Sequence, residues 1–110
     1  MLFCITANFT PKAMNAIRQN PKTNQRDSIE QLVKAAGGKL VGMYGTMTNG
    51  PGTLVIIDVD PIAAAAITGV LASSDGFQDI KMVRLFTQDE VTASREKRIQ
   101  LHAAYKPPGQ

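Results

Sequence analysis

Residues 39–59 read KLVGMYGTMTNGPGTLVIIDV, and this stretch decides the fold. Two runs rich in β-branched and apolar side chains flank the segment TNGPG, a pattern that predicts a β-hairpin at the centre of a sheet. Asn49, Gly50 and Gly52 tolerate a positive φ, and Pro51 fixes a bend between them. We expect the rest of the chain to cover this hairpin or to pair with its edges.

Strands and helices alternate on both sides of the hairpin. The pattern predicts a strand at 2–8, helical segments at 11–20 and 24–36, a helix at 61–73, a strand at 77–86 and a helix from 88 to about 104. Thr10 and Asp60 are N-cap residues that each precede a proline, and Thr87 opens a capping box. This order predicts an α+β fold of the ferredoxin-like type, a four-stranded antiparallel sheet covered by helices on one face. Residues 1–105 are expected to form one domain, and 106–110 a flexible tail.

The two longer helical segments before and after the hairpin differ in their hydrophobic pattern. The first has a single apolar stripe, formed by Ile29, Leu32, Val33 and Ala36. The second, at 61–73, is apolar nearly all round. We therefore expect the first to pack on one side and the second on more than one.

Alternation divides the strand residues between two faces of the sheet. The apolar set, expected to face the helices, includes Phe3, Ile5, Val41, Met43, Val55 and Ile57. The semi-polar set contains Cys4, Thr6, Asn8, Tyr44 and Thr46, joined by Asp58 and by either Arg84 or Lys81. The second face also carries Leu and Ile and is too apolar to stay wet over its whole area. A second copy is expected to cover it, which would give a homodimeric α/β barrel.

Charge is unevenly distributed along the chain. The net charge of +3 is the sum of +4 over residues 11–39, −4 over residues 40–80 and +3 over residues 81–110. Basic groups thus lie on the predicted helices and termini, as on a solvated helical surface. Aromatic residues are only 5% of the chain and none lies within a basic cluster, so nucleic-acid binding is not expected.

Cysteine use and the N-terminal sequence favour a soluble cytoplasmic protein. Cys4 is the only cysteine, so no intrachain disulfide is possible, which suits a reducing compartment. The start, MLFCITA, has no basic segment, and its apolar run is too short for a signal peptide or a membrane span. No membrane association is expected.

Candidate chemistry centres on the semi-polar face. Tyr44 and Asn8 can orient a phenolic or quinone-like substrate, and Asp58 can serve as a general base. A ligand-binding site would use Thr6, Asn8, Tyr44 and Arg84. Under the alternative interpretation, Tyr44 and the threonines hydrogen-bond across a dimer interface, while Asp58 pairs with Arg84 or caps a turn. No set of nucleophile, base and orienting group is visible, which favours this structural interpretation.

The remaining reactive side chains do not predict a metal or cofactor site. His102 is the only histidine and has basic neighbours, so a surface position is expected. Cys4 is expected to be a buried small hydrophobic residue. The glycines of the hairpin do not precede a helix N-terminus, so they do not predict a phosphate site. We expect no metal and no cofactor.

Several segments resemble the GYD-domain family. They are FTPKAMNAI, LVKAAGGKLVGMYGTM and MVRLFTQDEV, and the resemblance covers roughly residues 1–92. The family takes its name from a Gly, Tyr, Asp cluster at the turn into the third strand, where this chain has Asn49-Gly50-Pro51-Gly52-Thr53, without the Tyr or the Asp. The resemblance implies a ferredoxin-like fold that pairs as a dimeric α/β barrel, in a family mostly without an assigned activity.

Three functions are compatible with these observations. The leading hypothesis is a small cytoplasmic dimer that binds a small apolar or aromatic metabolite, in a pocket between sheet and helices or within the dimer interface. The first alternative is a cofactor-independent oxygenase or isomerase acting on an aromatic or quinone-like substrate. The second is an assembly module that docks a partner protein through its last helix.

Overall fold

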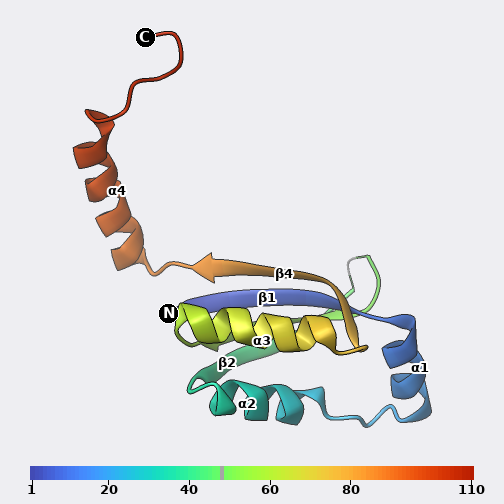
Figure 1. Ribbon diagram of the computed structural model, residues 1–110. Coiled ribbons are helices and arrows are strands. Elements are labelled where there is room, and N and C mark those ends of the chain that lie inside the picture. Colours follow the sequence, from blue (N-terminus) through green and yellow to red (C-terminus); the bar gives the residue numbers. More distant parts are fainter. Residues whose placement is uncertain (48) are drawn as a thin grey trace.

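In a computed structural model the chain forms a four-stranded antiparallel sheet with helices on one face and a last helix that extends away from it (Figure 1). The structure describes residues 1–47 and 49–110, so the first residue of the predicted turn, Thr48, lies outside the described residues. The elements are β1 (Leu2–Phe9), α1 (Pro11–Gln19), α2 (Gln25–Ala35), β2 (Lys39–Thr46), β3 (Gly52–Asp58), α3 (Pro61–Ser73), β4 (Phe77–Leu85) and α4 (Gln88–His102). The predicted ferredoxin-like α+β fold is confirmed.

The strands lie in the order β2-β3-β1-β4, and each neighbouring pair is antiparallel. The β2–β3 pair is the predicted hairpin. β1 pairs with β3 on one side and β4 on the other, so the first strand lies inside the sheet and β4 forms an edge. Two long connections, one through α1 and α2 and one through α3, place these strands side by side.

The core lies between the sheet and the pair α2 and α3. Its buried residues include Phe3, Ile5, Ile29, Val33, Leu40, Val55, Ile57, Val59, Ala64, Ile67 and Leu71. Ile57 and Val33 have no exposed surface, so the open end of the hairpin and the apolar stripe of α2 belong to the same core. The stripe predicted for this helix is confirmed, because Leu32 and Ala36 also pack against the core. In contrast, α1 has no buried residue.

The turn of the hairpin uses its glycines for two different reasons. Asn49 and Gly50 have φ values of 59° and 103°, as the sequence predicts. Gly52 does not have a positive φ, and that part of the prediction is wrong. A side chain at Gly52 would lie 2.7 Å from Asn8 Oδ1 and 2.9 Å from Thr46 Oγ1, so this position needs glycine for close approach.

The prediction that Val41 faces the helices is also wrong. The pairing of β2 with β3 shifts between Leu40 and Gly42, because a β-bulge adds one residue to β2. Leu40 therefore points into the core, while Val41 lies at the bulge and is 51% exposed. Simple alternation cannot locate such a bulge, because it assumes one residue per pleat.

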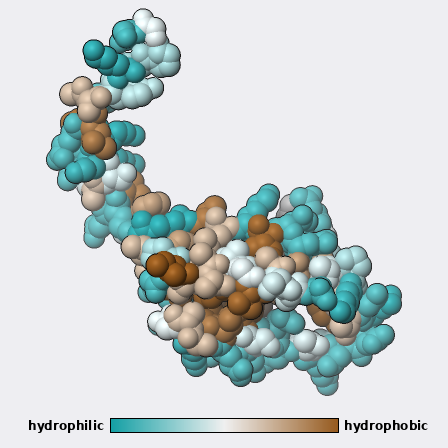
Figure 2. Space-filling model, in the orientation of Figure 1, coloured by the Kyte–Doolittle hydropathy of each residue, from teal (hydrophilic) through white to brown (hydrophobic). Residues whose placement is uncertain are grey.

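The helix α3 packs on one side only within the chain, contrary to the prediction. Ala64, Ile67 and Leu71 are buried, whereas Ile62 is 83% exposed. Much of its apolar character comes from alanines, which favour the helix without requiring burial. Figure 2 shows the resulting apolar surface over α3.

The last helix stands apart from the rest of the molecule. None of its residues is buried, and Figure 1 shows it leading away from α2 and α3 beyond the end of β4. The radius of gyration is 18.0 Å, and the longest dimension is 61 Å. A compact chain of this length has a radius of gyration of about 13 Å, so α4 and the following tail account for the extended shape.

Candidate functional site

A hollow of about 640 Å³ lies at the end of the sheet next to the hairpin turn. Its lining residues are Thr6, Ala7, Asn8, Thr46, Asn49, Asp79, Ile80 and Lys81. They come from β1, β2, β4 and the turn, so the hollow exists only because the sheet places these segments together. We treat this hollow as the candidate site.

One row of the sheet, a set of residues paired across neighbouring strands, lies at the hollow. Asn8 pairs with Gly52, which pairs with Thr46. Because Gly52 has no side chain, the Asn8 amide and the Thr46 hydroxyl lean over its backbone from both sides. The absence of a side chain at Gly52 thus lets the Ala7 carbonyl and these two polar side chains approach closely at the end of the sheet.

Asp79 forms one wall and has an unusual backbone conformation. Its φ is 54°, and it lies where the pairing of β1 with β4 shifts between Thr6 and Asn8. Asn and Asp adopt this left-handed conformation more readily than other non-glycine residues, and bulges often re-aim a side chain near a site. The Asn8 Nδ2 group donates to Asp79 Oδ2 at 3.5 Å and to the Asn49 carbonyl at 3.4 Å. Both bonds are long, so the Asn8 amide is weakly held and can reorient toward a ligand.

The charges of the hollow are balanced. Asp79 supplies an acceptor-only carboxylate, while Lys81, which pairs with Thr6, supplies a cationic donor. Hydroxyl and amide groups at Thr6, Asn8 and Thr46 add both donors and acceptors. The hollow therefore suits a small molecule whose polar group both donates and accepts hydrogen bonds.

Two of the four predicted ligand-binding residues, Thr6 and Asn8, line the hollow. Tyr44 lies in the row of Thr6, with Leu54 between them. Two strand spacings, about 10 Å, separate Tyr44 from Thr6. The Tyr44 ring lies over Gly42, on the side away from the hairpin turn, so Tyr44 does not line the hollow. The Tyr44 side chain is 63% exposed.

Arg84, the fourth predicted residue, lies on the other face of the sheet. It pairs with Phe3, whose side chain is in the core, so Arg84 shares the helix-covered face. Of the two basic residues considered for the semi-polar face, Lys81 is the one found there.

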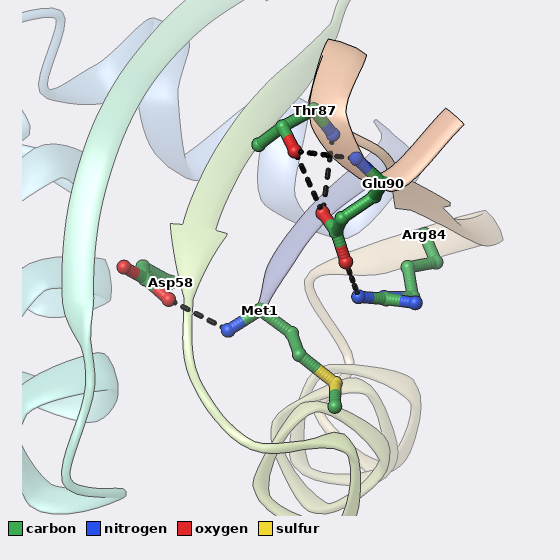
Figure 3. A network of polar contacts seen from close by, with 5 residues as sticks. All are labelled: Met1, Asp58, Arg84, Thr87 and Glu90. Atoms are coloured by element: carbon green, nitrogen blue, oxygen red, sulfur yellow. Dashed lines mark hydrogen bonds and ion pairs between the residues drawn. The ribbon is translucent and has the colours of Figure 1, made fainter. Parts of the chain in front are cut away.

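The three candidate catalytic residues do not meet within one chain. Asp58 pairs with Leu2, whereas Asn8 lies six residues further along β1, which corresponds to about 20 Å. The Asp58 carboxylate accepts a hydrogen bond from the Met1 amino group at 2.9 Å (Figure 3). The expected pairing of Asp58 with Arg84 is therefore wrong, because the chain terminus occupies that carboxylate instead.

Arg84 takes part in a separate polar network at the start of α4 (Figure 3). Its guanidinium forms an ion pair with Glu90, and it also lies 4.3 Å from the centre of the Phe86 ring. Glu90 accepts from the Thr87 backbone N–H at 3.1 Å, and Thr87 Oγ1 accepts from the Glu90 N–H at 3.2 Å. The predicted capping box is confirmed. The Thr87 N–H and then Arg84 hold the pKa of Glu90 below its ordinary value of 4.5.

The remaining reactive residues occupy unremarkable positions. His102 is exposed at the end of α4, as predicted. Cys4 is half-buried and pairs with Ile56 and Val83, away from the core face. Within residues 1–47 and 49–110, no three His, Cys, Asp or Glu side chains gather closely enough to hold a metal ion. In the same residues, no helix has the length and apolar character needed to cross a membrane.

Sequence reasoning did not single out Asp79, Asn49 and Lys81 together. No local pattern marks them, since Asp79 enters the hollow only through a bulge in β4 and Asn49 only through the turn. The available signal was alternation, which placed Thr6, Asn8, Thr46 and, as one of two options, Lys81 on the semi-polar face.

The family model of the GYD domain matches residues 3–94. The chain belongs to the GYD-domain family. The match covers the whole sheet, the first three helices and the start of α4, so the hollow lies entirely within the GYD domain and most of α4 lies outside it. A search of curated proteins finds no match to this chain.

Proposed function

We propose that this GYD-domain protein binds a small molecule in the hollow beside the hairpin turn, and that a second copy covers the open face of the sheet. The observation that carries the proposal is the hollow itself, where Asn8, Thr46, Asp79 and Lys81 bring hydrogen-bond donors and acceptors together from three strands. Sites for small molecules combine such convergent polar groups with adjoining apolar surface.

The adjoining surface indicates the kind of ligand. Leu54 and Tyr44 continue the row of Thr6 across the sheet, next to the hollow. A flat apolar or aromatic body can rest on this row while a polar substituent enters the hollow. This arrangement supports a metabolite with an aromatic or apolar part and one group that both donates and accepts, such as a carboxamide or a phenol.

The pairing of two copies is supported by the apolar side chains on the open face of the sheet, of which Val83 is 56% exposed and the others are half-buried. The face includes Leu2, Cys4, Leu54, Ile56, Val83 and Leu85. Soluble monomers rarely leave a contiguous apolar surface of this kind uncovered. A second sheet packed against it would bury these side chains and would also close the hollow, which is open to solvent in the single chain.

The proposed site is tested by native mass spectrometry of freshly purified protein, followed by titration with benzamide and phenol as probes. We expect two subunits and a retained or added ligand mass. Asn8→Ala should weaken probe binding about 2- to 10-fold, the effect of losing one hydrogen bond. Lys81→Gln should also weaken binding, while the control Lys22→Gln, at an exposed lysine between α1 and α2, should not. Equal binding by all three variants would refute the site.

The enzyme alternative remains a prediction with less structural support. Its candidate residues Tyr44, Asp58 and Asn8 lie in three different rows of paired residues, with Asp58 and Asn8 at opposite ends of the sheet. The alternative in which the last helix docks a partner is supported by the exposure of α4, which has no buried residue.

A further inference from the structure

Two residues of opposite charge line the hollow without pairing. Asp79 and Lys81 lie two positions apart in β4, and both line the hollow. The ion pairs formed among the described residues involve neither side chain. By contrast, the charged strand residues Asp58 and Arg84 each have a partner of opposite charge. The hollow therefore offers a carboxylate and an ammonium that are both available to a ligand.

The backbone of Asp79 distinguishes this pair from ordinary charges on a surface. Asp79 and Ile80 together face Ala7 of β1, because the pairing of β1 with β4 shifts by one residue there. Asp79 is the first residue of this β-bulge, and its φ is 54°. Glycine is the usual residue at the first position of a bulge with left-handed backbone, since a side chain there costs conformational energy. The chain thus keeps a carboxylate at a position where glycine would fit with less strain.

The neighbours of Asp79 leave its carboxylate incompletely satisfied. The Asn8 amide donates to Asp79 Oδ2 at 3.5 Å and to the Asn49 carbonyl at 3.4 Å, and both distances exceed those of an ordinary hydrogen bond. Within the part of the chain that the structure describes, no other side chain donates to the Asp79 carboxylate. A carboxylate can accept about four hydrogen bonds and a carbonyl about two, so acceptors outnumber donors at this end of the hollow. The ammonium group of a ligand would supply the missing donors.

Lys81 gives the hollow the opposite character on its other side. Its partner across β1 is Thr6, whose hydroxyl can donate or accept. The Lys81 ammonium suits an anionic oxygen of a ligand. Thr6 pairs in turn with Leu54, a half-buried apolar residue of β3. A single ligand can therefore meet acceptors, donors and an apolar surface within a few residues of one another.

We propose that the hollow binds a zwitterionic ligand, an amino acid with an aromatic or apolar side chain. Its ammonium binds Asp79 and the Asn49 carbonyl, its carboxylate binds Lys81, and its side chain lies along Leu54. The zwitterionic group both donates and accepts, so this inference rests on the proposed function and names the ligand class. Asp79 is then a specificity-determining residue, because its carboxylate favours a cationic group over a neutral one.

Three probes with the same phenyl group separate the two charges. Calorimetric titration of the full chain at about pH 7 compares L-phenylalanine, phenethylamine (ammonium only) and 3-phenylpropionate (carboxylate only). We expect L-phenylalanine to bind most tightly. Asp79→Asn should weaken binding of L-phenylalanine and phenethylamine about 3- to 10-fold and leave 3-phenylpropionate within about twofold. Lys81→Gln should weaken L-phenylalanine and 3-phenylpropionate and leave phenethylamine within about twofold.

Asp75→Asn is the matched control for the loss of a carboxylate. Asp75 is exposed just before β4, and its carboxylate pairs with Lys12 and does not line the hollow. This variant should leave all three affinities within about twofold. Equal effects of Asp79→Asn and Asp75→Asn on the three probes would overturn the proposal. So would L-phenylalanine binding no more tightly than 3-phenylpropionate, because the ammonium would then have no subsite.

Asp79→Gly tests whether the carboxylate serves binding or the bulge itself. Glycine relieves the left-handed strain, so the midpoint of thermal unfolding without ligand should rise by about 1–5 °C. The same variant should lose the preference for L-phenylalanine over 3-phenylpropionate. A midpoint that falls would show that Asp79 stabilises the bulge, and it would overturn the proposal.

Benzamide and phenol distinguish failure of this inference from failure of the proposed function. If both bind and Asn8→Ala weakens them, while the three charged probes show no selectivity, the site stands and the ligand class is wrong. If none of the probes binds, the proposed site and this inference both fail.

Discussion

The body (residues 1–86) and the C-terminal arm (residues 88–110) contain comparable helices in very different surroundings. In the body, α2 places one apolar stripe on the sheet, and Val33 has no exposed surface. In the arm, α4 is longer than α2 yet has no buried residue. Both helices have a clear N-cap, so local sequence specifies both starts equally well.

The comparison teaches that capping starts a helix but does not determine what the helix packs against. For α2 the stripe Ile29, Leu32, Val33 and Ala36 matches the spacing of the helix and faces the hairpin. For α4 the apolar residues are spread around the axis, so no single face can lie on its own sheet. The body therefore buries apolar side chains within one chain, whereas α4 buries none of its own.

The largest expected effect tests the body. Ile57→Ala removes a fully buried side chain of the core and should lower the free energy of unfolding by about 2–5 kcal/mol. Ile99→Ala should lower it by less than about 0.5 kcal/mol, because the Ile99 side chain is 74% exposed. Urea denaturation measures both. Equal losses would contradict the contrast between body and arm.

Within the body, the two hairpin glycines Gly52 and Gly45 form a matched pair. Gly52→Ala would push a Cβ into the space between Asn8 and Thr46 and should cost about 1–3 kcal/mol. A Cβ at Gly45 meets nothing within 4 Å, so Gly45→Ala should change stability by less than about 0.5 kcal/mol. Thermal unfolding of the two variants gives the comparison. Similar values would show that Gly52 is not held at close approach.

Loss of the N-cap at Thr87 should destabilise the first turn of α4. Thr87→Ala removes the hydroxyl that accepts from the Glu90 N–H and should destabilise α4 by about 0.5–2 kcal/mol. Amide exchange of residues 88–102 should accelerate while the core of the body stays protected. Thr92→Ala, at an exposed site in the same helix, is the control. Faster exchange in the core after Thr87→Ala would mean that arm and body unfold together.

The smallest expected effect is a pH dependence in the first turn of α4, where Glu90 lies. The folded-state pKa of Glu90 is lowered, so its contribution is fully present above the ordinary value of 4.5 and is lost as the pH falls through the lower folded value. Chemical shifts of α4 should therefore change on acidification below about pH 4.5, earlier than those of the core. Glu90→Gln should remove this step. A core that changes first, or a step that survives in the variant, would contradict the assignment.

Most of the fold could be predicted because local rules act on neighbouring residues. The caps at Thr10, Asp60 and Thr87 and the turn at Asn49-Gly50 all behave as their sequence indicates. Alternation also assigned Phe3 and Ile5 to the core. Alternation failed at Val41 because the bulge in β2 depends on how β2 pairs with β3. The residues of β2 alone do not reveal this pairing.

The candidate site could be predicted only in part, for a related reason. Thr6 and Asn8 end a recognisable strand, and both line the hollow. Asp79 joins them through the bulge in β4, and Asp58 is excluded because the antiparallel register places it at the opposite end of β1. Convergence of side chains from three strands depends on register, which is a property of strand pairs.

The sequence by itself determined the order of elements, the position of the hairpin turn, the helix caps and most of the core, because each depends on spacing within one segment. Only the tertiary structure decided that Gly52 serves as a point of close approach. It also decided which polar residues meet at the hollow and that α4 leaves the body. These features arise where two strands or two elements are brought together, since a contact between distant segments has no signature in either segment alone.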